Sequence, residues 1–260
     1  MIDYTFSLYD FEYFLLVLVR ISTFVFVAPF FSMSNTPARV RIAISFFTAI
    51  LLYGTLSPAV MPASDSVLQY ATVVIKEALT GLLIGFGTNM CTSIVSVTGA
   101  IADMETGLSM ATLYDPATRQ NTSITGVLYQ YAVTMMLIAS GMYRYLFGAL
   151  ADTFVLIPVN GAVFHADSLL ENVIRFMSQY ILIGFRIVLP IFCVMILLNA
   201  ILGVLAKVAP QMNMFAVGMQ IKIIVGLGTM FLTIGLLENA ADFIFEEMKV
   251  MITGFVQSMT

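Results

Sequence analysis

The sequence is poor in charge: only 10% of its 260 residues are Asp, Glu, Lys or Arg, whereas 60% are hydrophobic. A soluble domain carries about a quarter charged residues, and with so few it could not cover its surface. Its apolar runs are long and continuous, without the short alternating segments of a transmembrane β-barrel. The composition therefore predicts an all-α integral membrane protein, organised as a single polytopic unit over residues 1–260.

Basic clusters, cysteine and histidine are also scarce. The net charge is -4 and Lys and Arg are scattered singly, so nucleic acid is not expected as a partner. Cys91 and Cys193 both fall inside apolar runs and are interpreted as small buried hydrophobes rather than a disulfide framework. The single histidine, His165, has no Cys or acid at ligand spacing. We therefore expect no metal and no cofactor.

Catalytic motifs are missing as well. The segment "GLSMA" (107–111) departs from the nucleophile elbow G-x-S-x-G because Ala111 stands where the last glycine is needed. The sequence places no base for Ser109, and we find in it no phosphate-cradling loop and no pair of carboxylates at a helical spacing that can be defended as a catalytic pair. The protein is therefore not expected to be an enzyme.

What the sequence has in abundance is long apolar runs. A helix needs about 20 apolar residues to cross a bilayer. Six to seven long helices with kinked or broken hairpins are predicted, at 13–33, 42–60, 78–102, 124–142, 145–164, 180–206 and 212–237. Asp152 and Pro158 interrupt the fifth run, and Pro190 is expected to kink the sixth.

The distribution of basic residues predicts an orientation. The N-terminal segment has three acids and no base before Arg20, whereas the first turn contains Pro37, Arg39 and Arg41. Cytoplasmic loops carry an excess of Lys and Arg. The turn at 34–41 is therefore expected in the cytoplasm, and the N-terminus on the outer side.

The third run carries a polar and small-residue stripe. At about 100° per residue, its members fall within roughly a 120° sector; they are Glu77, Gly81, Gly85, Asn89, Thr92, Ser96, Gly99 and Asp103. Gly81 and Gly85 form a G-x-x-x-G, which allows close helix approach. Two interpretations stay open: a tight helix–helix seam, or a face toward a wet passage. The stripe is about 39 Å long, so the helix is expected to tilt, break near Thr98–Gly99 or extend beyond the bilayer.

Two further segments are unusual. Residues 104–123, "METGLSMATLYDPATRQNTS", are expected to form a loop because of Gly107 and Asp115-Pro116. The apolar residues of this loop either pack on the protein itself or form a constriction that closes a pore. The segment "APQMNMFAVGMQIK" (209–222) predicts a helix–turn–helix corner at Pro210, either a plain methionine-rich loop or a contact with partners.

Four motifs occur in one order that resembles the FliR family of flagellar and type III secretion export-gate proteins. They are "RISTFVFVAPFFSMSNTPARVRIAIS" (20–45), "EALTGLLIGF" (77–86), "DMETGLSMATLYDP" (103–116) and "APQMNMFAVGMQIKIIVGL" (209–227). The characteristic corner residues are Pro210, Gln211, Met212, Asn213, Phe215, Gly218 and Lys222. Three positions depart from the usual family pattern, namely Glu105, "SGMY" (140–143) and Gln220.

The resemblance implies a non-enzymatic subunit of a gate in the bacterial inner membrane, at the flagellar basal body. FliP-like and FliQ-like subunits are the implied partners, with FlhB-like and FlhA-like export components, unfolded export substrates and the lipid bilayer beside them. Family members pack in a spiral assembly partly raised above the membrane plane. The resemblance also implies a pore-plug loop, assigned here to Gly107, Leu108, Met110, Leu113, Tyr114, Asp115 and Pro116.

Three alternatives remain at this point. In the first, the chain is a secondary transporter whose helices break near Pro190 and Pro210, with Arg186 or Lys222 binding a solute. In the second, the chain belongs to an injectisome rather than a flagellum. In the third, it is a scaffold that only nucleates assembly.

Overall fold

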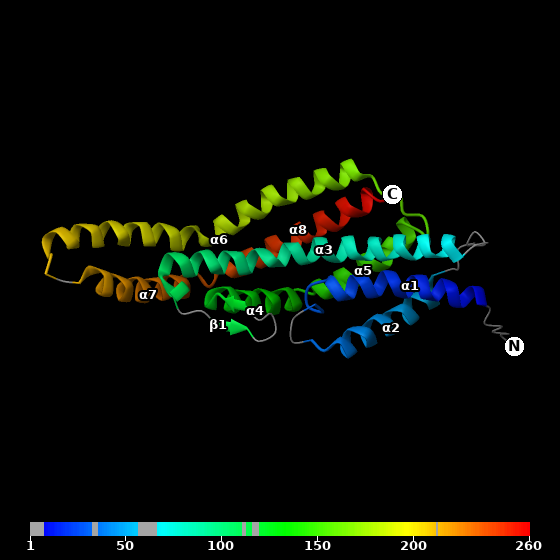
Figure 1. Ribbon diagram of the computed structural model, residues 1–260, viewed down its shortest axis with the longest axis horizontal. Coiled ribbons are helices and arrows are strands. Elements are labelled where there is room, and N and C mark those ends of the chain that lie inside the picture. The colour runs from blue at the N-terminus through cyan, green and yellow to red at the C-terminus, as the bar shows by residue number, and fades with distance from the viewer. Residues whose placement is uncertain (1–7, 33–35, 57–66, 111–112, 116–119, 212) are drawn as a thin grey trace. The chain divides into compact units, whose positions relative to one another are not determined.

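The computed structural model describes residues 8–32, 36–56, 67–110, 113–115, 120–211 and 213–260. Within these ranges the chain forms eight α-helices (Figure 1): α1 Leu8–Val27, α2 Ala38–Thr55, α3 Val67–Thr106, α4 Ile124–Ala139, α5 Met142–Leu156, α6 Ala166–Val208, α7 Met214–Thr233 and α8 Leu236–Gln257. A 3-10 turn, Leu108–Met110, and two short strands, β1 Leu113–Asp115 and β2 Gln120–Thr122, lie between α3 and α4. The predicted all-helical membrane class is confirmed, apart from this small hairpin.

The two longest helices exceed their predicted runs. α3 has 40 residues and is continuous, so the break considered near Thr98–Gly99 does not occur. α6 has 43 residues and contains Pro190 in its interior. The break near Pro190 that was considered for a transporter therefore does not occur, while the expected kink stays a prediction. One proline removes only one ladder bond, and the long helix on either side keeps the rest.

The last helix, α8, was missed by the sequence analysis. Its Leu237, Ile244 and Met248 are buried, whereas Glu238 and Asp242 are exposed. This spacing is that of an amphipathic helix. Its sequence is not a continuous apolar run, because the acids Glu238, Asp242 and Glu246 recur at intervals of four residues in its first half.

Four helices are long and apolar enough to cross a membrane: α2, α3, α6 and the part of α7 from Ala216 to Thr233. The number rises to five if α4 and α5 together form one broken span. This count concerns the described residues, and it is lower than the six to seven runs that the sequence shows.

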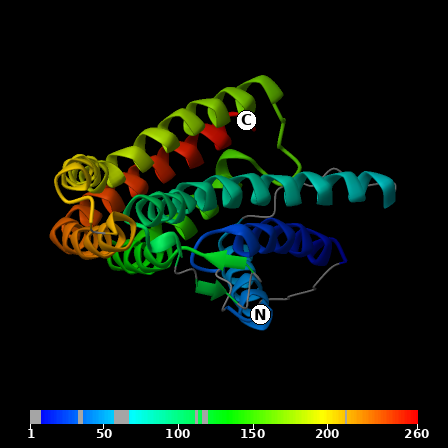
Figure 2. The ribbon, with the colours of Figure 1, turned by 60° about the vertical axis from the view of Figure 1, so that its left-hand side comes forward.

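The helices fall into two compact units. Unit 1 comprises residues 1–90, 141–175 and 247–260, and unit 2 comprises residues 91–140 and 176–246. In unit 1, α1 and α2 lie side by side in both views (Figures 1 and 2). Aromatic rings join them: Phe14 meets Phe46 edge-on at 6.0 Å between centroids and Tyr53 at 5.8 Å.

Unit 1 is held together where small residues let helices approach. A Cβ added at Gly85 of α3 would lie 3.0 Å from the carbonyl oxygen of Phe24 in α1. One added at Gly87 would lie 2.5 Å from the ring of Phe255 in α8. The side-chain amide of Asn172 donates to the carbonyl of Gly254 at 3.0 Å, which ties the start of α6 to α8.

Unit 2 has its own apolar core. The core is formed by the end of α3, by α6 and by α7, through Ala102, Ile191, Met195, Leu198 and Met230. α6 and α7 form an antiparallel pair in which Gly218 lies opposite Leu202 and Gly226 opposite Met195. The hairpin between α3 and α4 pairs its two strands in antiparallel register.

Candidate functional site

A buried ion pair lies in unit 1. Nε of Arg20 in α1 is 2.6 Å from Oε2 of Glu77 in α3, and both side chains are fully buried. Nη1 of Arg20 also donates to the backbone carbonyls of Thr153 at 3.2 Å and Ile157 at 2.9 Å. The guanidinium therefore connects α1, α3 and the carboxyl end of α5, where the last carbonyls of a helix need donors.

The second oxygen of Glu77 fixes the segment that follows α5. Oε1 accepts a hydrogen bond from the backbone N–H of Asn160 at 2.9 Å. Asn160 has a φ of 68°, a left-handed conformation that asparagine tolerates better than most residues. Within the described part of the chain, Nη2 of Arg20 has no hydrogen-bond partner, and the guanidinium carbon lies 4.3 Å from the ring centroid of Phe154. The cluster thus holds one turn in a strained shape with two charges removed from solvent.

A second buried acid lies in unit 2. Asp103, near the end of α3, accepts from the backbone N–H of Thr125 at 3.2 Å and from the Thr125 hydroxyl. Thr125 lies in the first turn of α4, and Ser123 caps this helix, because its hydroxyl accepts a hydrogen bond from the backbone N–H of Gly126 at 2.8 Å. The first N–H groups of a helix have no partner inside it, and its dipole favours a carboxylate there. Asp103 therefore anchors the start of α4 to the end of α3.

Glycines allow the end of α3 to pack closely against α4 and α7. A Cβ added at Gly99 would overlap the backbone of Gly126 in α4. A Cβ added at Gly226 of α7 would lie 2.5 Å from the Thr106 side chain. The base of the hairpin between α3 and α4 is thus fixed by a carboxylate, a helix cap and the close backbone contact of Gly99 with Gly126. We call these residues the α3–α4 clasp (Gly99, Asp103, Ser123, Thr125 and Gly126).

The structure distributes the predicted stripe over both units. Glu77, Gly81 and Gly85 contact α1 or its neighbours in unit 1, and Gly99 and Asp103 contact α4 in unit 2. Between them, Thr92 is buried, Asn89 is partly buried and Ser96 is exposed. Most of the stripe therefore packs inside the chain. Its role toward other subunits or a passage stays a prediction.

The predicted plug loop begins at Gly107, whose φ of +84° ends α3. Leu108 packs against the unit 2 core, whereas Met110 is 74% exposed. Leu113, Tyr114 and Asp115 form β1 and pair with β2, so these three residues are strand rather than irregular loop. Pro116 lies outside the described residues. Closure of a pore by this segment stays a prediction.

The predicted corner lies between α6, which ends at Val208, and α7, which begins at Met214. Asn213 caps α7, its side-chain oxygen accepting from the backbone N–H of Ala216 at 3.4 Å. Pro210 and Gln211 are exposed in the turn, and Met212 lies outside the described residues. Along α7 follow Phe215, the buried Gly218 and the partly buried Lys222. A helix–turn–helix corner at Pro210 is confirmed.

The first turn and α2 carry the remaining predicted residues. Pro37 precedes α2, and Arg39 lies exposed in its first turn. The guanidinium of Arg41 lies 5.9 Å from the ring centroid of Phe26. The cytoplasmic position of the turn stays a prediction.

Sequence reasoning missed the partners of the buried charges. Glu77 was placed in the polar stripe of the third run and Arg20 was noted as the first base of the chain, but the two were not recognised as a pair, and Asn160 and Thr125 were not singled out at all. A carboxylate inside an apolar run requires a buried donor, but that signal does not say which distant residue supplies it.

The fold and these clusters define a polytopic, helical membrane protein whose charged side chains are used as internal ties. The chain belongs to the family described as "Bacterial export proteins, family 1", which it matches over residues 11–248. It is 29% identical to the "Flagellar biosynthetic protein FliR" of Bacillus subtilis (strain 168) over 217 residues, 83% of each chain. It is 24% identical to the FliR protein of Escherichia coli (strain K12) over 245 residues, which covers 93% of this chain and 92% of that one. Against the FliR protein of Aquifex aeolicus (strain VF5), the identity is 25% over 247 residues, 94% of this chain and 93% of the relative. The resemblance expected from the four motifs is confirmed.

Proposed function

We propose that this protein is a non-catalytic subunit of the flagellar protein export gate, and that it forms, with FliP-like and FliQ-like subunits, the pore for unfolded substrates. The observation that carries the proposal is that this member of an export family buries charged side chains and exposes large apolar ones, the reverse of a soluble protein. Arg20, Glu77 and Asp103 are buried, whereas large apolar side chains such as Phe47, Leu197 and Phe231 are exposed. Such a surface is suited to lipid and to neighbouring apolar helices. The flagellar names of the relatives favour a flagellar over an injectisome gate.

Lys222 supports the requirement for partners. It is partly buried in α7, between the contacts that Gly218 and Gly226 make with α6. Among the residues that the structure describes, no carboxylate lies within 4 Å of its ammonium group. A cation in the middle of an apolar span is costly unless it meets an acid, backbone carbonyls or water. We assign the missing acceptor to a neighbouring subunit or to the aqueous path.

The segment between α3 and α4 supports a gating role. Its base is fixed by the α3–α4 clasp, while its exposed Met110 presents a flexible apolar side chain. A rigid base beside an exposed apolar side chain is an arrangement that can close a narrow aqueous path by excluding water. Residues 107–116 are therefore proposed as the plug.

The proposed setting is the inner membrane at the flagellar basal body. The excess of Arg39 and Arg41 in the first turn supports a cytoplasmic position for that turn, and an outer position for the N-terminus. FlhB-like and FlhA-like components are proposed as further neighbours, through which substrates reach the gate.

The plug is tested by ion leak through the assembled gate. Deleting 108–114 in the complex with FliP-like and FliQ-like subunits should raise the leak of ions into vesicles, while export of substrates survives. Met110→Ala should raise it to a smaller extent, and Met135→Ala, at a position of similar exposure in α4 (72%), should not. A deletion variant that assembles and stays as tight as the wild type would refute the plug.

A further inference from the structure

One face of α6 carries exposed apolar side chains between two exposed cations, Arg186 and Lys207. At about 100° per residue, Arg186, Leu197 and Val204 lie within about 20° of one another around the helix. The rest of this face is Leu189, Pro190, Cys193, Ala200 and Ile201, and Lys207 closes the same sector of about 120°. No polar side chain interrupts the face between the two cations.

The spacing of the two cations matches a bilayer. Lys207 follows Arg186 by 21 residues, about 31 Å at 1.5 Å per residue. The hydrocarbon core of a bilayer is about 30 Å thick. Among the intervening residues, 187–206, Asn199 is the only polar side chain, and it lies on the opposite side of the helix.

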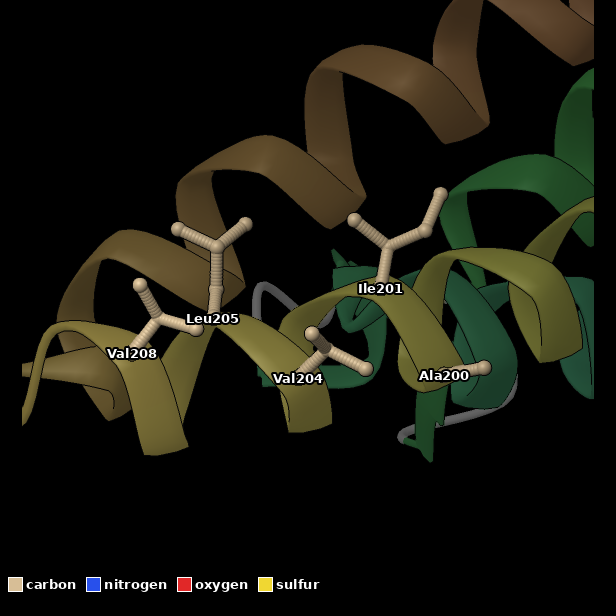
Figure 3. A pocket seen from close by; sticks show the side chains of 5 residues that line it. All are labelled: Ala200, Ile201, Val204, Leu205 and Val208. Carbon is tan, nitrogen blue, oxygen red and sulfur yellow. The ribbon is translucent and has the colours of Figure 1, made fainter.

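The carboxyl-terminal part of this face borders a hollow on the surface of α6. A shallow depression of about 400 Å³ is lined by Ala200, Ile201, Val204, Leu205 and Val208. Figure 3 shows these side chains on successive turns of α6, and every atom drawn in them is carbon. A wall of this kind offers no hydrogen bond to a peptide or a polar ligand, and it accepts a flexible hydrocarbon chain.

We propose that this face, the α6 lipid face (Arg186, Leu189, Cys193, Leu197, Ile201, Val204 and Lys207), lies against the acyl chains of phospholipids. Arg186 and Lys207 then reach the phosphates of the two leaflets. Neither cation is in an ion pair with any part of the chain that the structure describes, so both are available to anionic phosphates. Long basic side chains at the ends of a span extend to the interface in this way.

The assignment fixes the membrane depth of unit 2. The midpoint between Arg186 and Lys207 falls at Leu197, so the bilayer centre lies there. Arg186 marks one edge of the hydrocarbon, although the apolar run continues beyond it through Leu182. If the bilayer centre lay instead at the middle of that whole run, near Cys193, the guanidinium of Arg186 would lie inside the hydrocarbon. The inference goes beyond the gate proposal, because a gate subunit could equally cover this face with protein.

Single tryptophans test the depth, since the sequence contains none. Leu182, Leu189 and Leu197 lie on the same side of α6 and are 50%, 53% and 65% exposed. Each is replaced by Trp in the full chain, in nanodiscs of phosphatidylcholine and phosphatidylglycerol. The acyl chains carry bromine either near the headgroup or near the methyl end. The same variants are measured in the assembled gate, where subtraction of the wild-type complex isolates the one tryptophan.

Emission of Leu197→Trp should be quenched several-fold more by bromine near the methyl end than by bromine near the headgroup. Leu189→Trp should show the reverse order, and Leu182→Trp should be quenched least. Equal quenching of Leu189→Trp and Leu197→Trp by the deep bromine would move the centre to Cys193 and overturn the boundary at Arg186. Quenching at Leu197→Trp in the isolated chain but not in the gate would assign the face to a protein partner and overturn the lipid assignment.

The exposed native Cys193 gives a second readout that needs no change in the apolar face. In intact vesicles, a charged maleimide should leave Cys193 unmodified and modify Leu182→Cys, as read by peptide mass spectrometry. Modification of Cys193 at the rate of Leu182→Cys would contradict the proposal. Failure of these tests would leave the plug and the partner requirement to be decided by their own experiments.

Discussion

At the scale of single residues, Arg20 and Glu77 depend on one another because both charges are fully buried. Removal of one partner from a buried pair costs about 3–5 kcal/mol, because the other charge stays uncompensated. Glu77→Ala should therefore lower the free energy of unfolding by about that amount, measured by denaturation of the chain in mild detergent.

The double variant Arg20→Met/Glu77→Leu should recover much of this loss, since neither charge then remains buried. Asp242→Asn, at an exposed acid of α8, should change the stability by less than about 0.5 kcal/mol. If Glu77→Ala were as mild as Asp242→Asn, the pair would not tie the helices of unit 1 together.

Close helix approach makes a second prediction at this scale. A Cβ at Gly81 would overlap the carbonyl oxygen of Arg20 and the hydroxyl of Thr23, whereas one at Gly148 would meet nothing within 4 Å. Gly81→Ala should therefore destabilise unit 1 by about 1–3 kcal/mol, by forcing α1 and α3 apart. Gly148→Ala should be neutral or stabilise α5 by up to about 1 kcal/mol. Thermal denaturation of the two variants side by side distinguishes them, and equal melting temperatures would contradict the close contact.

Glu77 could be recognised from the sequence as a member of a polar stripe, but its partners could not. Glu77 stands in an apolar run, and burial of an unpaired carboxylate is too costly to be tolerated. Its partner is 57 residues away, and its second donor, Asn160, is 83 residues away. Such pairings depend on helix packing, which helical periodicity alone does not specify.

At the scale of elements, the α3–α4 clasp determines how firmly the hairpin is attached. Asp103→Ala removes the acceptor for two donors of Thr125, and an unsatisfied buried donor costs about 1–3 kcal/mol. The first amides of α4 should then exchange with deuterium at least ten-fold faster, as measured by mass spectrometry on peptides covering 120–127. Ser123→Ala, which removes only the cap, should have a smaller effect of about 1 kcal/mol. Unchanged protection in Asp103→Ala would show that the glycine contacts alone hold the junction.

Prediction of the elements succeeded where apolar runs are continuous and failed where they are not. The corner at Pro210 was placed correctly because proline and amides interrupt a long run. α8 was missed because the acids on its exposed face, such as Glu238 and Asp242, interrupt the apolar run. The hairpin of β1 and β2 was expected only as a loop, since three-residue strands carry too little pattern to be recognised.

At the scale of the whole molecule, Lys222 tests the need for partners. Lys222→Met removes a cation for which the described part of this chain supplies no acid, so the isolated chain should keep its stability within about 0.5 kcal/mol. Assembly with FliP-like and FliQ-like subunits, measured as the yield of intact complex, should fall several-fold, and Lys222→Arg should retain most of it. Normal assembly of Lys222→Met would remove the proposed intersubunit contact.

Membership of the export family could be recognised from four short motifs, because their order along the chain is specific. The division into two units could not, since α3, α6 and α8 each contribute residues to both. Continuous helices hide such a boundary from composition and from turn signals.

The central claim is that the exposed apolar surface of this chain is completed by other subunits around a closed aqueous path. Native mass spectrometry of the tagged chain, extracted from bacterial membranes in mild detergent, tests it most directly. We predict a complex that contains this chain together with FliP-like and FliQ-like subunits, and a several-fold lower yield of folded chain when those subunits are absent. A monodisperse, folded single chain, obtained equally well with or without them, would contradict the account.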